Sequence, residues 1–239
     1  MEAEVLYARA KLTLSLRVTG VRADGYHLLE SEMVTLDLAD RLEISPGDGL
    51  TVSGLGSDGP VPAGADNLVR RALDAVGRRA SIHLEKRIPT GAGLGGGSAD
   101  AAAVLRWAGC SDPSVAVGLG ADVPFCLAGG RALVRGVGEM VEPLPFADID
   151  GAVFTLLTPP LHVSTVEVYR TWDRLGGPRG DNGNDLEPAA LAVAPELVRW
   201  RDVLADASGE TPMLAGSGGT WFVRGAHPGP GRRVVRAAR

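Results

Sequence analysis

Apolar and polar residues alternate through the first part of the chain, which is the pattern of half-buried β-strands. The alternation from Val5 to Val18 predicts two strands that meet near residues 8–10. Further strands are predicted at residues 33–38, 41–44 and 81–88. In the last of these, one apolar face is formed by Ile82, Leu84 and Ile88. Residues 45–65 are rich in Gly, Pro, Ser and Asp, which indicates a hairpin and loops.

Helical periods appear from residue 66 onward. A helix is predicted to run from Asn67-Leu68 to about Val76, with Asp66 or Asn67 as its N-cap. Other helices are predicted at 98–107, 164–175, 188–192 and 197–205, and other strands at 131–134, 141–144, 153–157, 213–214 and 220–223. Because helices and strands mix without strict βαβ alternation, the pattern favours an α+β fold. The loop at 145–150 predicts domains at 1–148 and 149–239.

Composition narrows the class of protein. The 239 residues carry a formal charge of −5, from 24 basic and 29 acidic side chains, which argues against a nucleic-acid partner. Neither a signal peptide nor a run of about 18 apolar residues is visible, so no membrane partner is expected and a cytoplasmic location follows by elimination. The two cysteines, Cys110 and Cys126, lack zinc-site spacing and are interpreted as idle thiols.

The strongest local signal is a glycine-rich segment, residues 89–97, that leads into the alanine-rich helix. Five glycines fall within seven residues, and ordering them is entropically costly unless the backbone must approach something closely. Backbone N–H groups at a helix start form an anion site, and triphosphate is the natural occupant. Ser98 can cap this helix, or its hydroxyl can reach a phosphate or Mg²⁺. No Lys precedes Ser98, so this is not a Walker loop. A flexible linker or a tight helix–strand turn is the alternative.

A second signal is one carboxylate, Asp122, in the apolar stretch 119–126. A buried charge needs a partner, and Lys11 stands alone among the apolar residues of the first strands. At a phosphoryl-transfer site, such an Asp can orient a hydroxyl and accept its proton, while Lys stabilises developing charge. The alternatives stay open: Asp122 as a helix or turn cap, and Lys11 as a surface residue.

Three weaker segments carry polar or glycine residues. Residues 24–27 place Tyr and His side by side after a turn, and residues 184–188 can simply start a helix. Residues 216–220 can form a tight turn or a second backbone surface near phosphate.

Taken together, these segments resemble the GHMP kinases, the family of galactokinase, homoserine kinase and mevalonate kinase. The resemblance runs from Ala10-Lys11 to residues 216–222. Residues 89–102 match the phosphate loop shared by all members, whereas residues 22–27, 120–125 and 184–187 are typical of the erythritol kinase branch. The resemblance implies a ribosomal-protein-like N-terminal domain and a ferredoxin-like C-terminal domain, with the active site between them.

The resemblance also implies roles for individual residues. Lys11 and Asp122 would be the catalytic pair. Tyr26 and His27 would hold a cytosine ring, with Tyr169 on its other side. ATP and its phosphates would contact Asn67, Leu68, Pro89, Gly91, Ala92, Gly93, Leu94, Gly95, Gly96, Gly97 and Ser98. The acceptor would contact Thr13, Asp24, Tyr26, His27, Thr165, Tyr169, Gly216, Ser217 and Gly218.

The reaction so implied is direct in-line transfer of phosphate from ATP to the 2-hydroxyl of a cytidyl diphosphate ester of methylerythritol, in non-mevalonate isoprenoid precursor biosynthesis. ATP is the co-substrate, and Mg²⁺ is expected with Ser98 as a candidate ligand. A monomer or weak homodimer is expected.

Three features depart from the family pattern. Thr13 stands where Asn is usual, the link 107–119 is short, and residues 224–239 replace a terminal helix and strand, so this tail is expected to be a solvated end. They motivate two alternatives: a GHMP kinase acting on another small alcohol or phosphate, and a relative that binds nucleotide without catalysis.

Overall fold

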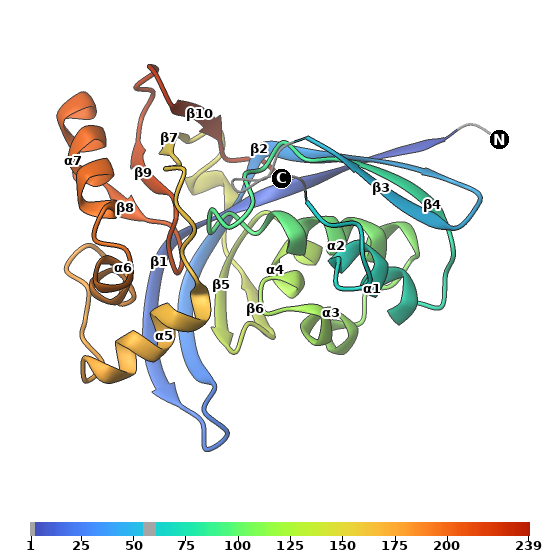
Figure 1. Ribbon diagram of the computed structural model, residues 1–239, viewed down its shortest axis with the longest axis horizontal. Coiled ribbons are helices and arrows are strands. Elements are labelled where there is room, and N and C mark those ends of the chain that lie inside the picture. The colour runs from blue at the N-terminus through green and yellow to red at the C-terminus, as the bar shows by residue number, and fades with distance from the viewer. Residues whose placement is uncertain (1–2, 55–60) are drawn as a thin grey trace.

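The computed structural model describes residues 3–54 and 61–239, and it contains two β-sheets with helices packed against each (Figure 1). The first sheet has the order β3-β4-β2-β5-β6, with β1 paired to β2. Its strands are β1 (Glu4–Val21), β2 (His27–Ser45), β3 (Gly49–Ser53), β4 (Ser81–Glu85), β5 (Arg131–Gly136) and β6 (Met140–Pro143). One face is covered by α1 (Leu68–Ala75), α2 (Gly96–Trp107), α3 (Pro113–Leu119) and α4 (Val123–Ala128).

The second sheet has the order β10-β7-β9-β8. Its strands are β7 (Val153–Leu157), β8 (Met213–Leu214), β9 (Trp221–Arg224) and β10 (Arg232–Arg236). Helices α5 (Thr165–Arg174), α6 (Glu187–Val193) and α7 (Leu197–Ser208) accompany it, and a short 3-10 helix, η1 (Phe146–Asp148), precedes it. The proposed boundary between residues 148 and 149 therefore falls between the two sheets.

The sequence-based elements match the structure wherever the signal is local. The helix capped by Asn67 is α1, and Asn67 Oδ1 accepts a hydrogen bond from the Val69 N–H at 2.9 Å. The hairpin predicted within 45–65 is different: β3 runs parallel to β4, and the order of the sheet separates β3 from β2. Residues 55–60 of that stretch lie outside the described residues.

Strand β1 shows how the two sheets meet. It was expected as two strands but is a single one, with a shift in its register to β2 between Arg9 and Lys11. Beyond the shift, Leu12 and Leu14 belong to the apolar cluster shared with the second sheet. The alternate residues Lys11 and Thr13 point to the opposite face. Because this half of β1 is covered on both faces, residues 10–14 are all buried and the simple alternation breaks.

The expectation that residues 224–239 form a solvated end is wrong. Residues 232–236 form β10, an edge strand antiparallel to β7, and Val235 is buried. The Ala237 N–H donates to Ala152 O, and the Ala238 N–H donates to Thr35 O in β2. The basic composition of this segment suggested a solvated tail. Charged residues are also common on edge strands, so composition alone does not separate the two. The C-terminus thus lies beside the middle of β2 (Figure 1).

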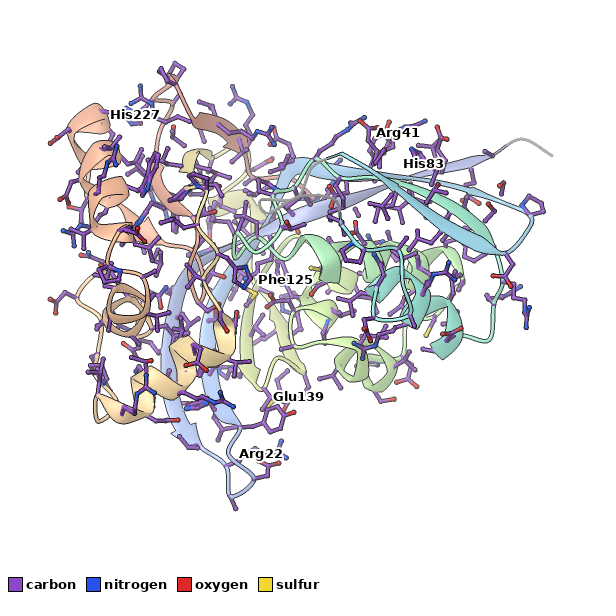
Figure 2. The ribbon with its side chains drawn as sticks, in the orientation of Figure 1. Arg22, Arg41, His83, Phe125, Glu139 and His227 are labelled. Atoms are coloured by element: carbon purple, nitrogen blue, oxygen red, sulfur yellow. The ribbon has the colours of Figure 1, made fainter. Side chains whose placement is uncertain are left out.

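Three apolar clusters make up the core. One lies between the first sheet and α1–α4 and includes Phe125 of α4, which is fully buried in the interior (Figure 2). The second joins β1 and β2 to the second sheet, and the third lies between the second sheet and α5–α7. In the part of the chain that the structure describes, no helix has the length and apolar character needed to cross a membrane.

Candidate active site

The glycine-rich segment connects β4 to α2, and the helix begins earlier than the alanine pattern predicted. Helix α2 starts at Gly96, and its N-cap is Gly95, with φ at +68° and no side chain to cap the helix. Ser98 therefore does not cap the helix, which corrects that prediction, and lies in its first turn. The first N–H groups of α2 are not satisfied by a side-chain cap, as expected for a helix start that receives an anion.

Lys11 and Asp122 come together although 110 residues separate them along the chain. Lys11 Nζ lies 3.4 Å from Asp122 Oδ2 and donates a hydrogen bond to Thr13 Oγ1 at 2.9 Å. The Lys11 side chain is 5% exposed, so it is not a surface residue, while that of Asp122 is 32% exposed. Asp122 occupies the N-cap position of α4, but its side chain makes no capping hydrogen bond. Its carboxylate is therefore available to the ammonium and to a ligand.

Two glycine segments enclose the Lys11 ammonium. The aliphatic part of Lys11 passes Gly95 so closely that a Cβ there would lie 2.7 Å from Lys11 Cγ. A Cβ on Gly216 would lie 3.4 Å from Lys11 Nζ. The segments also touch each other, because a Cβ on Gly93 would lie 2.3 Å from Ala215 O. Residues 91–95 of the first domain and 215–219 of the second thus pack backbone to backbone beside the Lys–Asp pair.

Residues 184–185 connect the second glycine segment to β1 through hydrogen bonds. The sequence analysis did not predict this role. Asn184 Nδ2 donates to Leu214 O at 2.8 Å and to Gly216 O at 2.7 Å. The Asp185 carboxylate accepts from Arg17 Nη1 at 2.6 Å and from the Val18 N–H at 3.0 Å. Helix α6 begins at Glu187, as the helix-start interpretation of residues 184–188 predicted. That interpretation did not include the hydrogen bonds of Asn184 and Asp185. The available signal was two polar residues ahead of an apolar helix.

A pocket of about 620 Å³ opens next to the pair and contains five of the residues predicted to bind the acceptor: Asp24, Tyr26, His27, Thr165 and Tyr169. Gly120 and Ala121, which immediately precede Asp122, also line it. Thr165 Oγ1 lies 2.7 Å from Ser217 Oγ, which joins the pocket to the second glycine segment. Arg22 lies at the tip of the β1–β2 hairpin, and Glu139 lies at the turn between β5 and β6 (Figure 2).

The aromatic residues of the pocket contact one another. The His27 and Tyr169 rings are 4.7 Å apart between centroids and the His27 and Trp172 rings 5.5 Å, whereas Tyr26 is 63% exposed. A spacing of 4.7 Å is direct ring contact, so a base cannot lie between His27 and Tyr169 as they stand. His27 Nε2 is 2.8 Å from Asp173 Oδ1, and Asp173 was missed by the sequence-based prediction. Burial raises the pKa of Tyr169, which keeps its phenol neutral.

The remaining predicted residues surround the start of α2. Leu68 Cδ1 would lie 3.4 Å from a Cβ on Gly97, so the first turns of α1 and α2 are adjacent. The Asn67 amide is used locally, because Nδ2 donates to Pro62 O at 2.9 Å while Oδ1 caps α1. Thr13 is 2% exposed and bonds Lys11, so it supports the pair. Its contact with an acceptor stays a prediction.

Within residues 3–54 and 61–239, no group of three or more His, Cys, Asp or Glu side chains is placed to hold a metal ion. Ser98 is partly exposed, and its Oγ lies 4.0 Å from where a Cβ of Gly120 would be, close to the segment that carries Asp122. Mg²⁺ prefers oxygen donors and keeps several waters and phosphate oxygens. The hydroxyl of Ser98 and the carboxylate of Asp122 fit that preference.

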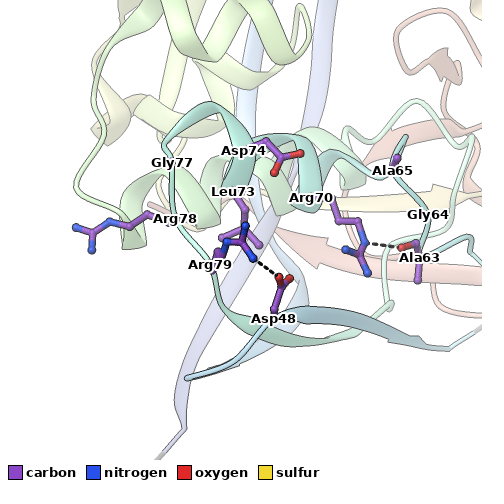
Figure 3. Close-up of a pocket in the computed structure, with 10 residues that line it drawn as sticks. All are labelled: Asp48, Ala63, Gly64, Ala65, Arg70, Leu73, Asp74, Gly77, Arg78 and Arg79. Atoms are coloured by element: carbon purple, nitrogen blue, oxygen red, sulfur yellow. Dashed lines mark hydrogen bonds and ion pairs between the residues drawn. The ribbon is translucent and has the colours of Figure 1, made fainter.

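Another cavity, of about 560 Å³, borders α1 (Figure 3). Three of its charged groups are engaged within the protein: Arg79 Nη1 lies 3.0 Å from Asp48 Oδ2, and Arg70 Nε donates to Ala63 O at 2.7 Å. Its described lining residues include none of those predicted to bind ATP or acceptor. We therefore place the candidate site at the pocket beside Asp122.

Known proteins resemble this chain over most of its length. The family model of the GHMP kinases N terminal domain matches residues 67–130. A 4-diphosphocytidyl-2-C-methyl-D-erythritol kinase of Cereibacter sphaeroides is 39% identical over 243 residues, covering 90% of this chain and 87% of the relative. A kinase of the same name from Paracoccus denitrificans is 41% identical over 234 residues, covering 90% and 84%.

A crystal structure of 4-(cytidine 5'-diphospho)-2C-methyl-D-erythritol kinase is 35% identical and superimposes with a TM-score of 0.72, covering 92% of this chain and 89% of that one. The expected two-domain α+β GHMP kinase fold is confirmed, as is the prediction of an ATP-dependent small-molecule kinase. This chain belongs to the GHMP kinases, and within them to the family of the 4-diphosphocytidyl-2-C-methyl-D-erythritol kinases.

Proposed function

We propose that this protein uses ATP to phosphorylate the 2-hydroxyl of 4-diphosphocytidyl-2-C-methyl-D-erythritol, a step of non-mevalonate isoprenoid precursor biosynthesis. The observation that carries the proposal is the Lys11–Asp122 pair, which lies where two glycine segments and the aromatic pocket meet. A nucleotide phosphate and an acceptor hydroxyl can therefore approach the same carboxylate from two sides.

Each group of the site has a chemical role in this proposal. Asp122 orients the acceptor hydroxyl and accepts its proton as the new bond to phosphorus forms. The Lys11 ammonium, held by Thr13, lies beside the Asp122 carboxylate and stabilises charge on the transferred group. Backbone N–H groups of residues 91–97 bind the phosphates. No phosphoenzyme forms.

Mg²⁺ is part of the proposal, with Ser98 and phosphate oxygens as its ligands. When bound, it neutralises charge on the triphosphate.

The aromatic pocket is proposed to take the cytidyl end of the acceptor. Tyr26 is exposed and supplies a ring for stacking, while the polar edge of His27 is oriented by Asp173. Because His27 and Tyr169 contact each other, we place the base against Tyr26 and the outer face of this ring pair. The boundary at residues 148 and 149, the cytoplasmic location and the monomeric or weakly dimeric state also stay proposals.

The test measures ADP release with Mg·ATP and the cytidyl acceptor, for the wild type and for Asp122→Ala. Asp202→Ala is a matched control, because it removes a carboxylate of α7 that is 57% exposed and pairs with the neighbouring Arg201. We expect acceptor-dependent release that falls by about 10²–10⁴-fold in Asp122→Ala and is unchanged in Asp202→Ala.

Three outcomes contradict the proposal in different ways. Release with homoserine or mevalonate but not with the cytidyl acceptor would assign another substrate. ATP binding without turnover on any acceptor would indicate a non-catalytic relative. Full activity in Asp122→Ala would show that the carboxylate is not the catalytic group.

A further inference from the structure

A buried cluster of three charged side chains lies directly under the start of α2. Lys86 Nζ contacts Asp40 Oδ2 and lies 2.7 Å from Asp100 Oδ2. The exposed fractions of the Lys86, Asp40 and Asp100 side chains are 3%, 0% and 4%. The residues come from β2, from the residue after β4 and from α2, so the cluster joins three elements. The sequence carried a signal for it, since Lys86 falls on the apolar face of the alternating stretch 81–88.

The cluster holds the glycine-rich segment at both ends. Before the segment, Asp40 Oδ1 accepts hydrogen bonds from the backbone N–H groups of Arg87 at 2.5 Å and Ile88 at 2.8 Å. After the segment, Asp100 extends from the second turn of α2. The Lys86 ammonium therefore connects Asp40, which binds the backbone before the glycine segment, to Asp100, which belongs to the helix after it. The contact is close, because a Cβ on Gly96 would lie 3.2 Å from Lys86 Nζ.

The free energy of burying these charges indicates that the cluster contributes little net stability to the fold. Burying an ammonium and two carboxylates carries a large desolvation penalty, and apolar residues of similar size often stabilise as well or better. Within the described residues, Asp100 Oδ1 is buried and makes no hydrogen bond. What the cluster does provide is fixed geometry for a five-glycine segment whose free backbone would sample many conformations.

We propose that Lys86, Asp40 and Asp100 form a clamp that sets the separation of the two ends of the glycine segment and so preorganises its N–H groups for the triphosphate of ATP. This inference rests on the proposed kinase function, because its ligand is the nucleotide of that reaction. The three residues are positioning residues and act through the backbone of residues 89–97. Preorganisation raises affinity because the ordering of the segment is complete before the ligand arrives.

Asp100 is the best member of the clamp to test. Asp100→Ala removes the carboxylate that links α2 to Lys86 but leaves the Lys86–Asp40 pair. No buried charge is therefore left unpaired. We expect its Kd and KM for ATP to rise about tenfold, equivalent to about 1.4 kcal/mol, with kcat changed less than twofold. Asp100→Asn keeps the shape and an oxygen for Lys86, and is expected to restore ATP affinity. Hydrogen exchange at residues 89–97 should quicken in the Ala variant alone.

Val104→Ala is the matched control, since Val104 is fully buried on the same helix, four residues further along, and packs in the first-domain core. It loosens α2 without touching the clamp, so ATP affinity should stay at the wild-type value. If Asp100→Ala lowers stability like Val104→Ala but binds ATP like the wild type, the clamp is merely structural and the inference fails. If Asp100→Ala does not fold, Asp100→Ser, which leaves a smaller cavity, takes its place. Weaker ATP binding by Asp100→Ser then supports the clamp, and wild-type ATP binding rejects it.

Calorimetry with ATP alone separates this inference from the proposed function, because it needs no acceptor. A wild type that binds ATP, with the expected loss in Asp100→Ala, but does not phosphorylate the cytidyl acceptor would support the clamp and reject the function. A wild type that turns over the acceptor, with unchanged ATP affinity in Asp100→Ala, would reject the clamp and keep the function.

Discussion

Gly93→Ala tests whether the two glycine segments pack against each other. Gly93 has φ at +75°, and a Cβ there would lie 2.3 Å from Ala215 O and 2.8 Å from Gly218 O. Both neighbours are backbone carbonyl oxygens, which cannot rotate away as the end of a side chain can. The segments must therefore move apart by roughly 1 Å to reach normal van der Waals separation. That movement would open the site at the Lys11 ammonium.

The expected loss of stability has two parts. Alanine in the left-handed region costs about 1–2 kcal/mol relative to glycine. Overpacking against a fixed backbone costs about 1–3 kcal/mol more. The sum, about 2–5 kcal/mol, is a large share of the roughly 5–15 kcal/mol that stabilises a typical protein. At about 2–4 °C per kcal/mol for a chain of this size, Tm should fall by roughly 4–20 °C.

Thermal and denaturant unfolding would measure this loss, and titration with ATP would measure the opening of the site. Gly97→Ala is the control for stability, because Gly97 lies in α2 and its Cβ would meet only Leu68 Cδ1, at 3.4 Å. Alanine is the better helix former by up to about 1 kcal/mol, so Gly97→Ala should be neutral or stabilising. If Gly93→Ala melts within about 2 °C of the wild type, the backbone-to-backbone contact is not present in solution and the reasoning is refuted.

Three further predictions follow from hydrogen bonds and burial. Thr13→Val removes the hydroxyl that holds Lys11 Nζ, so kcat should fall about tenfold, whereas Thr13→Asn, which keeps an acceptor oxygen, should stay near wild type; equal rates in steady-state kinetics would contradict this. Asn184→Ala leaves the Gly216 carbonyl without its donor and should lower the free energy of unfolding by about 1–3 kcal/mol in urea; an unchanged midpoint would argue against the contact. Burial raises the pKa of Asp100 from 3.8 to about 7, so the protonated form is favoured on folding. The unfolding free energy of the wild type relative to Asp100→Asn should therefore fall as pH rises from about 4 to 7 and level off above; parallel pH profiles would disprove it.

Local patterns in the sequence were enough for the elements that depend on neighbouring residues. The alanine-rich helix, the Asn67 cap and the strands near residues 131–157 were predicted because periodicity, capping and turn residues act within a few positions. The same is true of the glycine segment, whose composition alone points to an anion. Its first helical residue was misplaced because glycines that begin a helix look the same as glycines that precede one.

The short elements after residue 107 were harder to predict. Helix α4 holds six residues and places Asp122 at its N-cap position, which sequence reasoning kept open against a catalytic role. Strand β10 was missed altogether, since its two adjacent valines, Val234 and Val235, stand among arginines and show no alternation, and only Val235 is buried. Such an edge strand is specified by pairing with β7, and that partner lies about eighty positions earlier.

The sequence by itself therefore determined which residue types were available: a lysine among apolar strand residues, a carboxylate within an apolar stretch, and a glycine segment that leads into a helix. The tertiary structure decided that these meet. The register shift in β1 turns Lys11 toward the glycine segment, and the backbone contact at Gly93 holds the second domain against it. The clamp at Lys86 also emerged only in three dimensions. Ion pairs and backbone contacts between distant residues depend on the register and packing of whole sheets, which no short window of sequence contains.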